Sequence, residues 1–359
     1  RTSFCCRGIH QAHLRHVGHV SSDQTTSTIH SCDGEGITAT EYTMTFRWGS
    51  PLAPFLALML CVSVASAQQA TLFPVLRGAI SARSAALGGA TVALTEDPAT
   101  VVLNPAVLPT VTDRRVTATF LKHVADINSG MASYQGDIEG TGSFAVTAMF
   151  TSYGSFDRAD RFGTTTGSFS ASDVVFGVSF AREIDTLITW GVTAKYMQSS
   201  LDDMAASAIA FDAGVMFRLP QSRTNIGFSI LNLGTQLATY DGTKDRLPVD
   251  VRLGVNHRLR GLPLLVNASL NHLADDVARF TDRFLNFSVG GEFYVGKYVR
   301  LRLGYDNSTR NLSGVNVATQ LTGVSGGLGV RLATFDIDYA MSSLGSSAML
   351  HRMTVGLDL

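Results

Sequence analysis

The dominant feature of the chain is an alternation of apolar and polar side chains. From about Ala118 to Leu359, runs of roughly ten residues alternate in this way and are separated by turns of Gly, Asp, Asn and Ser. The clearest run is Val249–Leu259, in which odd positions are nearly all apolar and even positions are charged, amide or glycine. Because successive side chains of a strand point to opposite faces, such a run has one apolar and one polar face. The pattern predicts an all-β chain.

The spacing of these runs predicts about fourteen strands, as in a transmembrane antiparallel β-barrel. The expected strands are Arg115–His123, Met131–Glu139, Ser143–Tyr153, Asp173–Arg182, Leu187–Gln198, Ala206–Leu219, Thr224–Leu233, Val249–Leu259, Leu262–His272, Phe284–Val295, Tyr298–Asp306, Thr322–Leu332, Thr334–Ser342 and His351–Leu359. An open strand edge in hydrocarbon would leave N–H and C=O groups without partners, at several kcal/mol each. The last strand is therefore expected to pair with the first.

Aromatic residues near the ends of the apolar stripes favour a membrane barrel. Trp190 and Tyr196 lie on the apolar side of their strand, and Lys195 lies on the other side. Aromatic girdles at the two membrane interfaces produce this arrangement. The alternative is a soluble β-sandwich whose apolar faces form a dry core.

Composition supports the membrane interpretation and excludes several classes of function. Charged residues make up 16% of the chain, below the roughly 25% usual for soluble domains. Glycine is abundant, with 34 residues, and mean hydropathy is +0.17. The formal net charge of −1 provides no field that would attract nucleic acid, so no nucleic-acid partner is expected.

Residues 44–67 have the three parts of a secretory signal peptide. Met44 to Arg47 is a short basic region, residues 52–64 are apolar, and Ala65-Ser66-Ala67 followed by Gln68 forms a cleavage site. A buried core helix is the alternative. Residues 1–43 are interpreted as an upstream translated or disordered segment, because they precede a methionine that starts a complete signal.

The cysteines give no chemistry to the part of the chain after the predicted cleavage. All four precede it, so neither a disulfide nor a thiol nucleophile is expected there: Cys5, Cys6, Cys32 and Cys61. The first 32 residues also hold several histidines, but their spacing with these cysteines matches no zinc module. No metal site is predicted.

Residues 68–112 form a segment of a different kind. It contains the small-residue run Ala79–Ala90, then Thr95–Ala99 with Asp97, and then Asn104-Pro105-Ala106. Small residues let backbones pack closely, and Asn-Pro ends extended chain in a turn. The segment is predicted to be a plug or hatch inside the barrel of residues 113–359. An ordinary periplasmic linker is the alternative.

These residues resemble a known family. The sequence SARSAALGGATVAL followed by EDPATVVLNPAVL is similar to the opening of the PorV/PorQ proteins, which are FadL-like outer-membrane barrels of the type IX secretion system. The similarity continues in Gly167–Asp173, Ala210–Gly214, Ile230–Gly234 and Leu247–Val249, and the features "GSFSASD … LPVDVRLG" are closest to PorQ.

The resemblance implies a non-enzymatic part of a protein-export machine in the outer membrane of a Bacteroidetes-type Gram-negative bacterium. Its partners would be other type IX components, secreted cargo or surface protease proteins, and outer-membrane lipid. It also implies plug or hatch roles for Gly88, Gly89, Asp97, Asn104, Pro105 and Ala106. The terminal Leu359 departs from the aromatic residue that is common at the end of such barrels.

A search for catalytic chemistry finds none. The histidines after the signal are isolated, and no HExxH or SxxK arrangement is present, so no catalytic residue and no cofactor are predicted. His257 and His272 are expected on the apolar side of their strands. The glycines of Gly323–Gly329 lie inside an alternating strand, where they favour close packing or a bend over a phosphate loop.

Charged residues at polar positions of the strands are expected to line the lumen: Lys195, Asp250, Arg252, Arg258, Glu292, Arg300, Arg302, Arg331, Asp336, Asp338, Arg352 and Asp358. Their mixed signs favour ion pairs that brace the plug, with a conduction path as the alternative. Two functions remain open. One is a docking scaffold of the secretion system, and the other is a FadL-like transporter of hydrophobic small molecules, which would need an apolar pocket near Asn104-Pro105-Ala106.

Overall fold

The computed structural model contains two compact units, residues Arg1–Ala65 and Ser66–Leu359. The residues that it describes are 26–29, 42–45, 73–111, 114–123, 126–277, 279–312, 321–345 and 348–359. In the first unit, β1 (Thr26–Ile29) pairs antiparallel with β2 (Tyr42–Thr45). Of the predicted signal peptide, only Met44 and Thr45 are among the described residues. Its cleavage residues Ala65, Ala67 and Gln68 lie outside them.

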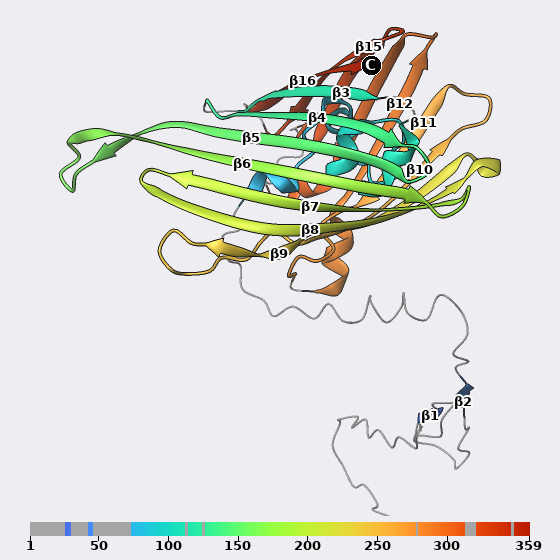
Figure 1. Cartoon of the computed structure of the whole chain (residues 1–359), viewed down its shortest axis with the longest axis horizontal. Coiled ribbons are helices and arrows are strands. Elements are labelled where there is room, and N and C mark those ends of the chain that lie inside the picture. Colours follow the sequence, from blue (N-terminus) through green and yellow to red (C-terminus); the bar gives the residue numbers. More distant parts are fainter. Residues whose placement is uncertain are drawn as a thin grey trace, which may run out of the picture. The chain divides into compact units, whose positions relative to one another are not determined.

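Fourteen strands of the second unit form a closed antiparallel barrel (Figure 1). They are β3 (Arg115–Lys122), β4 (Asn128–Ile138), β5 (Gly142–Ala159), β6 (Thr165–Glu183), β7 (Ile188–Leu201), β8 (Met204–Leu219), β9 (Thr224–Ala238), β10 (Asp250–Arg258), β11 (Leu264–Leu270), β12 (Phe287–Val295), β13 (Val299–Asp306), β14 (Val324–Arg331), β15 (Phe335–Ser343) and β16 (Met349–Asp358). Each strand pairs with the next, and β16 pairs with β3 with Val355 opposite Ala118. The predicted strands and their closure are confirmed.

Alternation along the strands separates the barrel into a polar interior and an apolar exterior. In β3, Thr117 and Thr119 are buried inside, whereas Phe120 is 52% exposed on the outside. In β7, Lys195 is buried and Tyr196 is exposed, as predicted. Large apolar side chains are exposed on the outer face of nearly every strand. Such a continuous belt is stable in hydrocarbon and unfavourable in water, so the barrel is transmembrane.

The two ends of the barrel differ in the length of their connections. At one end the strands are joined by short turns, for example residues 139–141 and 296–298. At the other end lie long connections: residues 239–249, residues 271–286 with η5 (Phe280–Leu285), and residues 307–323 with α3 (Asn307–Leu312). We call these the turn end and the loop end. In bacterial outer-membrane barrels the short turns face the periplasm, so the loop end corresponds to the outer side.

The hairpin of β5 and β6 extends beyond the neighbouring strands at the loop end (Figure 1). The sequence pattern predicts that the first strand ends at Tyr153 and that the second begins at Asp173. Both strands were therefore predicted too short on the side of the hairpin. Residues 155–168 are exposed on both faces. Water lies on both sides of a strand outside the membrane, so the alternation that marks a strand in the membrane is lost there.

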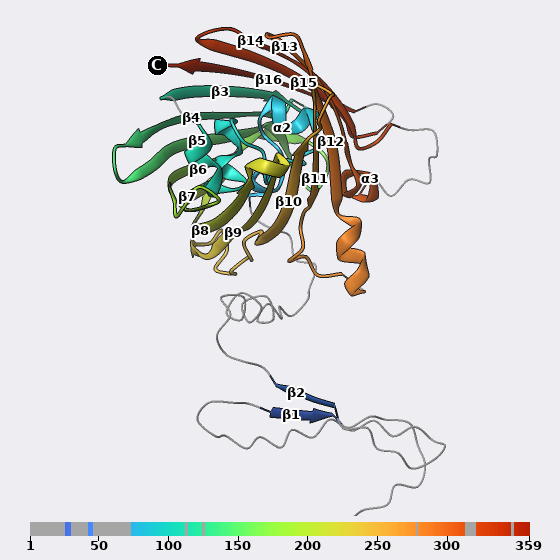
Figure 2. The same ribbon diagram turned by 90° about the vertical axis from the view of Figure 1, so that its right-hand side faces the viewer.

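The segment before β3 folds into short helices within the ring of strands (Figure 2). These are η1 (Pro74–Arg77), α2 (Ala82–Ala86), η2 (Pro98–Val102) and η3 (Pro105–Thr110). The side chains of Asp97 and Asn104 accept hydrogen bonds from the backbone at the starts of η2 and η3, and each is followed by a proline at the first helical position. This sequence favours the start of a helix, because the cap satisfies a free N–H and proline lacks one. We call residues 73–111 the plug.

Among the described residues, no helix is long and apolar enough to cross a membrane. The remaining short helix, η4 (Pro220–Ser222), lies in the turn between β8 and β9.

Replacing an apolar residue on the outer belt by a charge should destabilise the folded barrel. Phe176 is outward-facing and 53% exposed near the middle of the membrane part of β6. We expect Phe176→Arg to reduce the free energy of unfolding in lipid by about 2–4 kcal/mol, measured by urea titration in vesicles. Phe162→Arg, at the exposed tip of the β5–β6 hairpin, is the control and should leave stability unchanged. Equal effects of the two substitutions would contradict the assignment of the belt.

Candidate functional site

The plug touches the barrel wall most closely at inward-facing glycines. A methyl group at Gly191 would lie 2.6 Å from the Pro105 carbonyl carbon, and one at Gly304 would lie 2.2 Å from the backbone nitrogen of Gly88. Real Cβ atoms essentially never come within 3.0 Å of a heavy atom of a residue that is not adjacent in the chain. The same crowding occurs where other wall glycines face the plug: Gly214, Gly227, Gly254, Gly290 and Gly327. Glycine in these strands therefore permits backbone-to-backbone contact with the plug.

The Asn104-Pro105-Ala106 motif fastens the plug to β7 and β8. Asn104 is fully buried, and its side chain accepts a hydrogen bond from Ala106 N–H at 3.1 Å and donates one to the Val92 carbonyl at 2.8 Å. Thr189 on β7 donates to the Ala106 carbonyl at 2.9 Å. Ala106 packs with Val107 and the wall residue Met216. The motif therefore lies in a packed region, and the apolar pocket that a conduit would need is not at these residues.

Gly88, Gly89 and Asp97, the other residues of the predicted hatch motif, occupy turns and caps of the plug. Gly88 and Gly89 have φ angles of +67° and +77°, which L side chains rarely adopt. Asp97 is buried, and one of its carboxylate oxygens accepts a hydrogen bond from Ala99 N–H at 3.0 Å. Burial raises the pKa of Asp97, although the positive charge of Arg83 opposes this shift.

A chain of buried charges joins the plug to the wall near the turn end. Arg83 of the plug contacts Glu292 on β12 through two bonds of 2.9 and 3.0 Å. Glu292 also contacts Arg302 on β13 at 2.6 Å, and Arg302 contacts Asp338 on β15 at 2.5 Å. Removing one member would leave a buried charge without its partner, which typically costs about 3–5 kcal/mol. The structure thus has the bracing ion pairs that the sequence predicted for the lumen.

Arg83 was not among the residues identified from the sequence. It is the only charged residue between Arg77 and Glu96, in a run of small and apolar residues. A lone cation in such a run requires a carboxylate if the run is buried. That signal indicates an ion pair but not its partner, because Glu292 is far away in the sequence.

A second buried charge cluster lies in the wall between β7, β8 and β9. Lys195 contacts Asp212 at 2.7 Å and donates to the side-chain oxygen of Asn232 at 2.9 Å. Asn232 has a left-handed backbone, and its N–H donates to Asp212 at 2.8 Å, which marks a bulge in the pairing of β8 with β9. Its side chain also donates to the Pro248 carbonyl at 3.0 Å. Three short motifs noted in the sequence, around Asp212, Asn232 and Pro248, therefore meet at one bulge.

A cavity of about 350 Å³ lies at the loop end of the lumen. Its floor is the start of the plug, residues Pro74, Val75 and Arg77–Ile80. Apolar wall residues are Leu121, Ile127, Leu344 and Leu350, and polar ones are His123, Ser129, Tyr153, His272 and Arg352. The lining also includes Arg77, Arg252 and Asp306 and several Ser, Thr and Asn side chains. It therefore combines apolar side chains with a larger number of polar ones.

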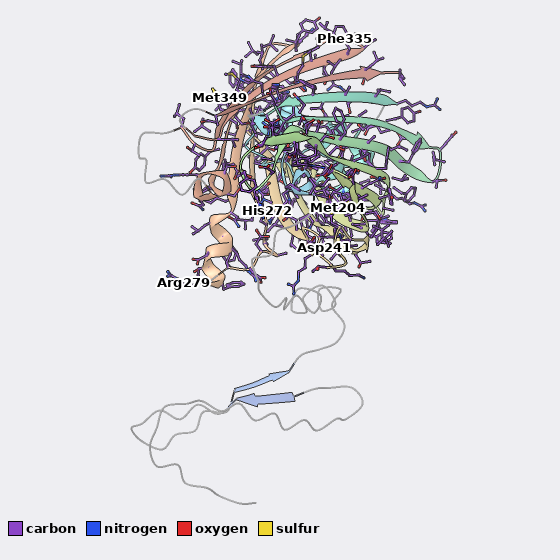
Figure 3. All side chains as sticks on the ribbon, turned by 90° about the vertical axis from the view of Figure 1, so that its left-hand side faces the viewer. Met204, Asp241, His272, Arg279, Phe335 and Met349 are labelled. Atoms are coloured by element: carbon purple, nitrogen blue, oxygen red, sulfur yellow. The ribbon has the colours of Figure 1, made fainter. Side chains whose placement is uncertain are left out.

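His272, labelled in Figure 3, lies in this cavity and not on the outer face. Its Nδ1 is 3.0 Å from an oxygen of Asp250, which also accepts from Arg252 at 2.7 Å. The expected outward position is wrong because β11 ends at Leu270, before the alternation reaches the histidine.

His257 is exposed, as expected, and bonds Thr224 at 2.9 Å. Among the described residues, no three His, Cys, Asp or Glu side chains cluster as metal ligands would.

Filling the space at a wall glycine should displace the plug. Gly290 and Gly291 are neighbours on β12, and a methyl group at Gly290 would lie 2.5 Å from the Leu87 carbonyl oxygen, whereas Gly291 has only the tip of Leu264 at 3.5 Å. We expect Gly290→Val to raise the conductance of the barrel in planar bilayers severalfold, because the plug must move, and Gly291→Val to leave it unchanged. The same conductance in both variants would show that the plug does not depend on this contact.

Comparison with known proteins shows that the fold of this chain is similar to that of several solved structures. No protein-family description and no curated protein matches the chain. The Pseudomonas putida toluene transporter TodX matches with a TM-score of 0.53 and 13% identity over 77% of this chain and 96% of that one. The CymD monoaromatic hydrocarbon channel matches with a TM-score of 0.52 and 11% identity over 78% and 97%. A Pseudomonas aeruginosa FadL homologue matches with a TM-score of 0.50 and 11% identity over 77% and 98%. The chain has a FadL-like fold, and its resemblance to PorV/PorQ stays a prediction.

Proposed function

We propose that the chain is a non-enzymatic outer-membrane transport protein that admits small, largely apolar molecules at the loop end. The cavity of about 350 Å³ supports this function most directly. Its floor is the beginning of the plug, so a bound molecule touches the element that fills the lumen. Proteins of the same fold are described as a toluene transporter and as monoaromatic hydrocarbon channels, which agrees with this function.

The inside of the barrel is also apolar on the side of β4 to β8. Buried Met131, Met149, Val175 and Met197 pack against the plug residues Leu103 and Leu108. Methionine side chains are flexible and adapt to neighbours of different shapes. A molecule that leaves the cavity as the plug shifts would therefore meet an apolar surface along this side.

A second candidate is the role in type IX secretion that the sequence resemblance implies, with secretion components and cargo proteins as partners. The observation that favours it is the packing around Asn104-Pro105-Ala106, where the cavity expected of a conduit is replaced by side chains of plug and wall. A docking scaffold tolerates such a filled lumen.

Uptake of radiolabelled toluene by Gram-negative cells that produce the chain tests the first function. We expect saturable uptake above that of cells with an empty vector. Val75→Trp should reduce it about tenfold, because the indole occupies the cavity floor, and a tenfold change corresponds to roughly 1.4 kcal/mol of binding free energy. Val192→Trp on the outer belt is the matched control and should have no effect. Uptake equal to the empty vector, together with loss of surface-attached cargo on deletion of the gene, would favour the second candidate.

A further inference from the structure

Arg352 differs from the other buried cations of the barrel. The buried cations among the described residues are Arg83, Arg115, Lys195, Arg252, Arg302 and Arg352. The first five each lie within 4 Å of a carboxylate. Arg352 is 8% exposed, and within the described ranges no carboxylate lies within ion-pair distance of its guanidinium group. It is a buried charge without a counter-charge.

The guanidinium group of Arg352 has unused hydrogen-bonding capacity. Arg352 lies at an inward position of β16 and lines the 350 Å³ cavity. One terminal nitrogen donates to Ser342 Oγ at 3.0 Å, and Nε has no hydrogen-bond partner among the described residues. A buried cation with a free donor is unfavourable unless something satisfies it. An anionic oxygen group in the cavity would do so.

The other charged and titratable groups around the cavity do not supply that anion. The single carboxylate among its lining residues is Asp306, whose two oxygens accept hydrogen bonds from Ser308 and Thr309 at 2.6–2.9 Å. Arg77 is paired with Asp275, and Arg252 with Asp250. The remaining titratable lining groups are His123, Tyr153 and His272, none of which is an anion at neutral pH.

His123 completes the polar side of the cavity. Its Nε2 lies 3.0 Å from Ser129 Oγ. Burial, together with the positive charge of Arg352, lowers the pKa of His123 below its ordinary value. The imidazole is therefore neutral at neutral pH and adds a hydrogen-bonding group beside the guanidinium charge.

The apolar lining and the size of the cavity limit the rest of the ligand. Val75 and Ile80 of the plug and Leu121 and Leu350 of the wall are among the apolar lining residues. Its volume of about 350 Å³ is near the lower end of the roughly 300–1,000 Å³ of small-molecule sites. This space suits one aromatic ring or a short hydrocarbon chain.

We propose that this cavity selects small organic acid anions, with Arg352 as the specificity-determining residue that binds the carboxylate and the apolar lining holding an aromatic ring or short chain. The inference rests on the proposed transport function and narrows its substrate class. The cavity is expected to bind such anions more tightly than neutral hydrocarbons of the same size and more tightly than long-chain acids.

Calorimetric titration of the purified full-length protein in detergent with benzoate, toluene and hexadecanoate tests this inference. We expect benzoate to bind saturably. Arg352→Gln should weaken benzoate binding roughly tenfold to a hundredfold, as expected for loss of a charge-assisted hydrogen bond, and should leave toluene binding within about twofold. Arg352→Lys should retain part of the affinity. Arg223→Gln, an exposed arginine at the turn end, should have no effect.

A thermal unfolding curve of each variant separates a binding role from a structural one. Because Arg352 lacks a counter-charge, Arg352→Gln should unfold at the same temperature as the parent or higher. A large decrease in unfolding temperature, unchanged benzoate affinity in Arg352→Gln, or tighter Arg352-dependent binding of hexadecanoate than of benzoate would overturn the inference. Binding of toluene without benzoate would overturn it and leave the proposed function standing. Absence of both binding and toluene uptake would overturn the proposed function as well.

Discussion

Close backbone contact between the plug and the barrel wall is the constraint on which the arrangement of this molecule depends. The wall glycines bring the plug within a distance that any side chain would block, as at Gly191 beside Pro105 and at Gly304 beside Gly88. Once the backbone is this close, plug carbonyls and side chains reach partners on the wall. Thr189 bonds the Ala106 carbonyl, and Arg83 reaches Glu292. The glycines thus determine which wall residues can stabilise the plug.

The fixed plug divides the lumen into regions of different chemistry. Toward the turn end, Arg83, Glu292, Arg302 and Asp338 form a linear chain of buried ion pairs. Toward the loop end, the start of the plug leaves a cavity lined by both apolar and polar side chains. Complete pairing of charges holds the plug in place and leaves little for a ligand to bind. Arg352, in contrast, lines the cavity and has a hydrogen-bond donor without a partner. A ligand in the cavity can supply the missing partner.

The strands could be predicted because lipid imposes a local rule. Every residue of a strand such as Val249–Leu259 faces either hydrocarbon or the lumen, so its polarity records its direction. The rule ends at the membrane boundary, which explains why the β5–β6 hairpin was predicted too short and His272 was placed on the wrong face. The plug was predicted from its small residues and from the turn expected at Asn104-Pro105. That Asp97-Pro98 and Asn104-Pro105 start short helices is seen only in the structure.

Pairs of residues and the cavity could not be predicted in the same way. Arg302 and Glu292 meet because β12 and β13 pair with these residues opposite each other, a register that the alternation alone does not determine. The cavity is formed by residues of the plug, β3, β4, β5, β10, β13, β14, β15 and β16 together with their connections. Its lining residues extend along the sequence from Pro74 to Arg352. The sequence identified Arg352 as a lumen residue, but only the closed barrel shows that, of the buried cations among the described residues, it is the one without a carboxylate partner.

Residues 73–111 form a firmly held plug inside the barrel, and the division of the lumen depends on it. Hydrogen–deuterium exchange of the intact protein in lipid nanodiscs measures most directly how firmly the plug is held. We expect the backbone amides of α2, η2 and η3 to exchange about as slowly as those of the neighbouring strands, and much more slowly than the amides of loop residues 239–249. Exchange of the plug amides at the rate of these loop residues would contradict it.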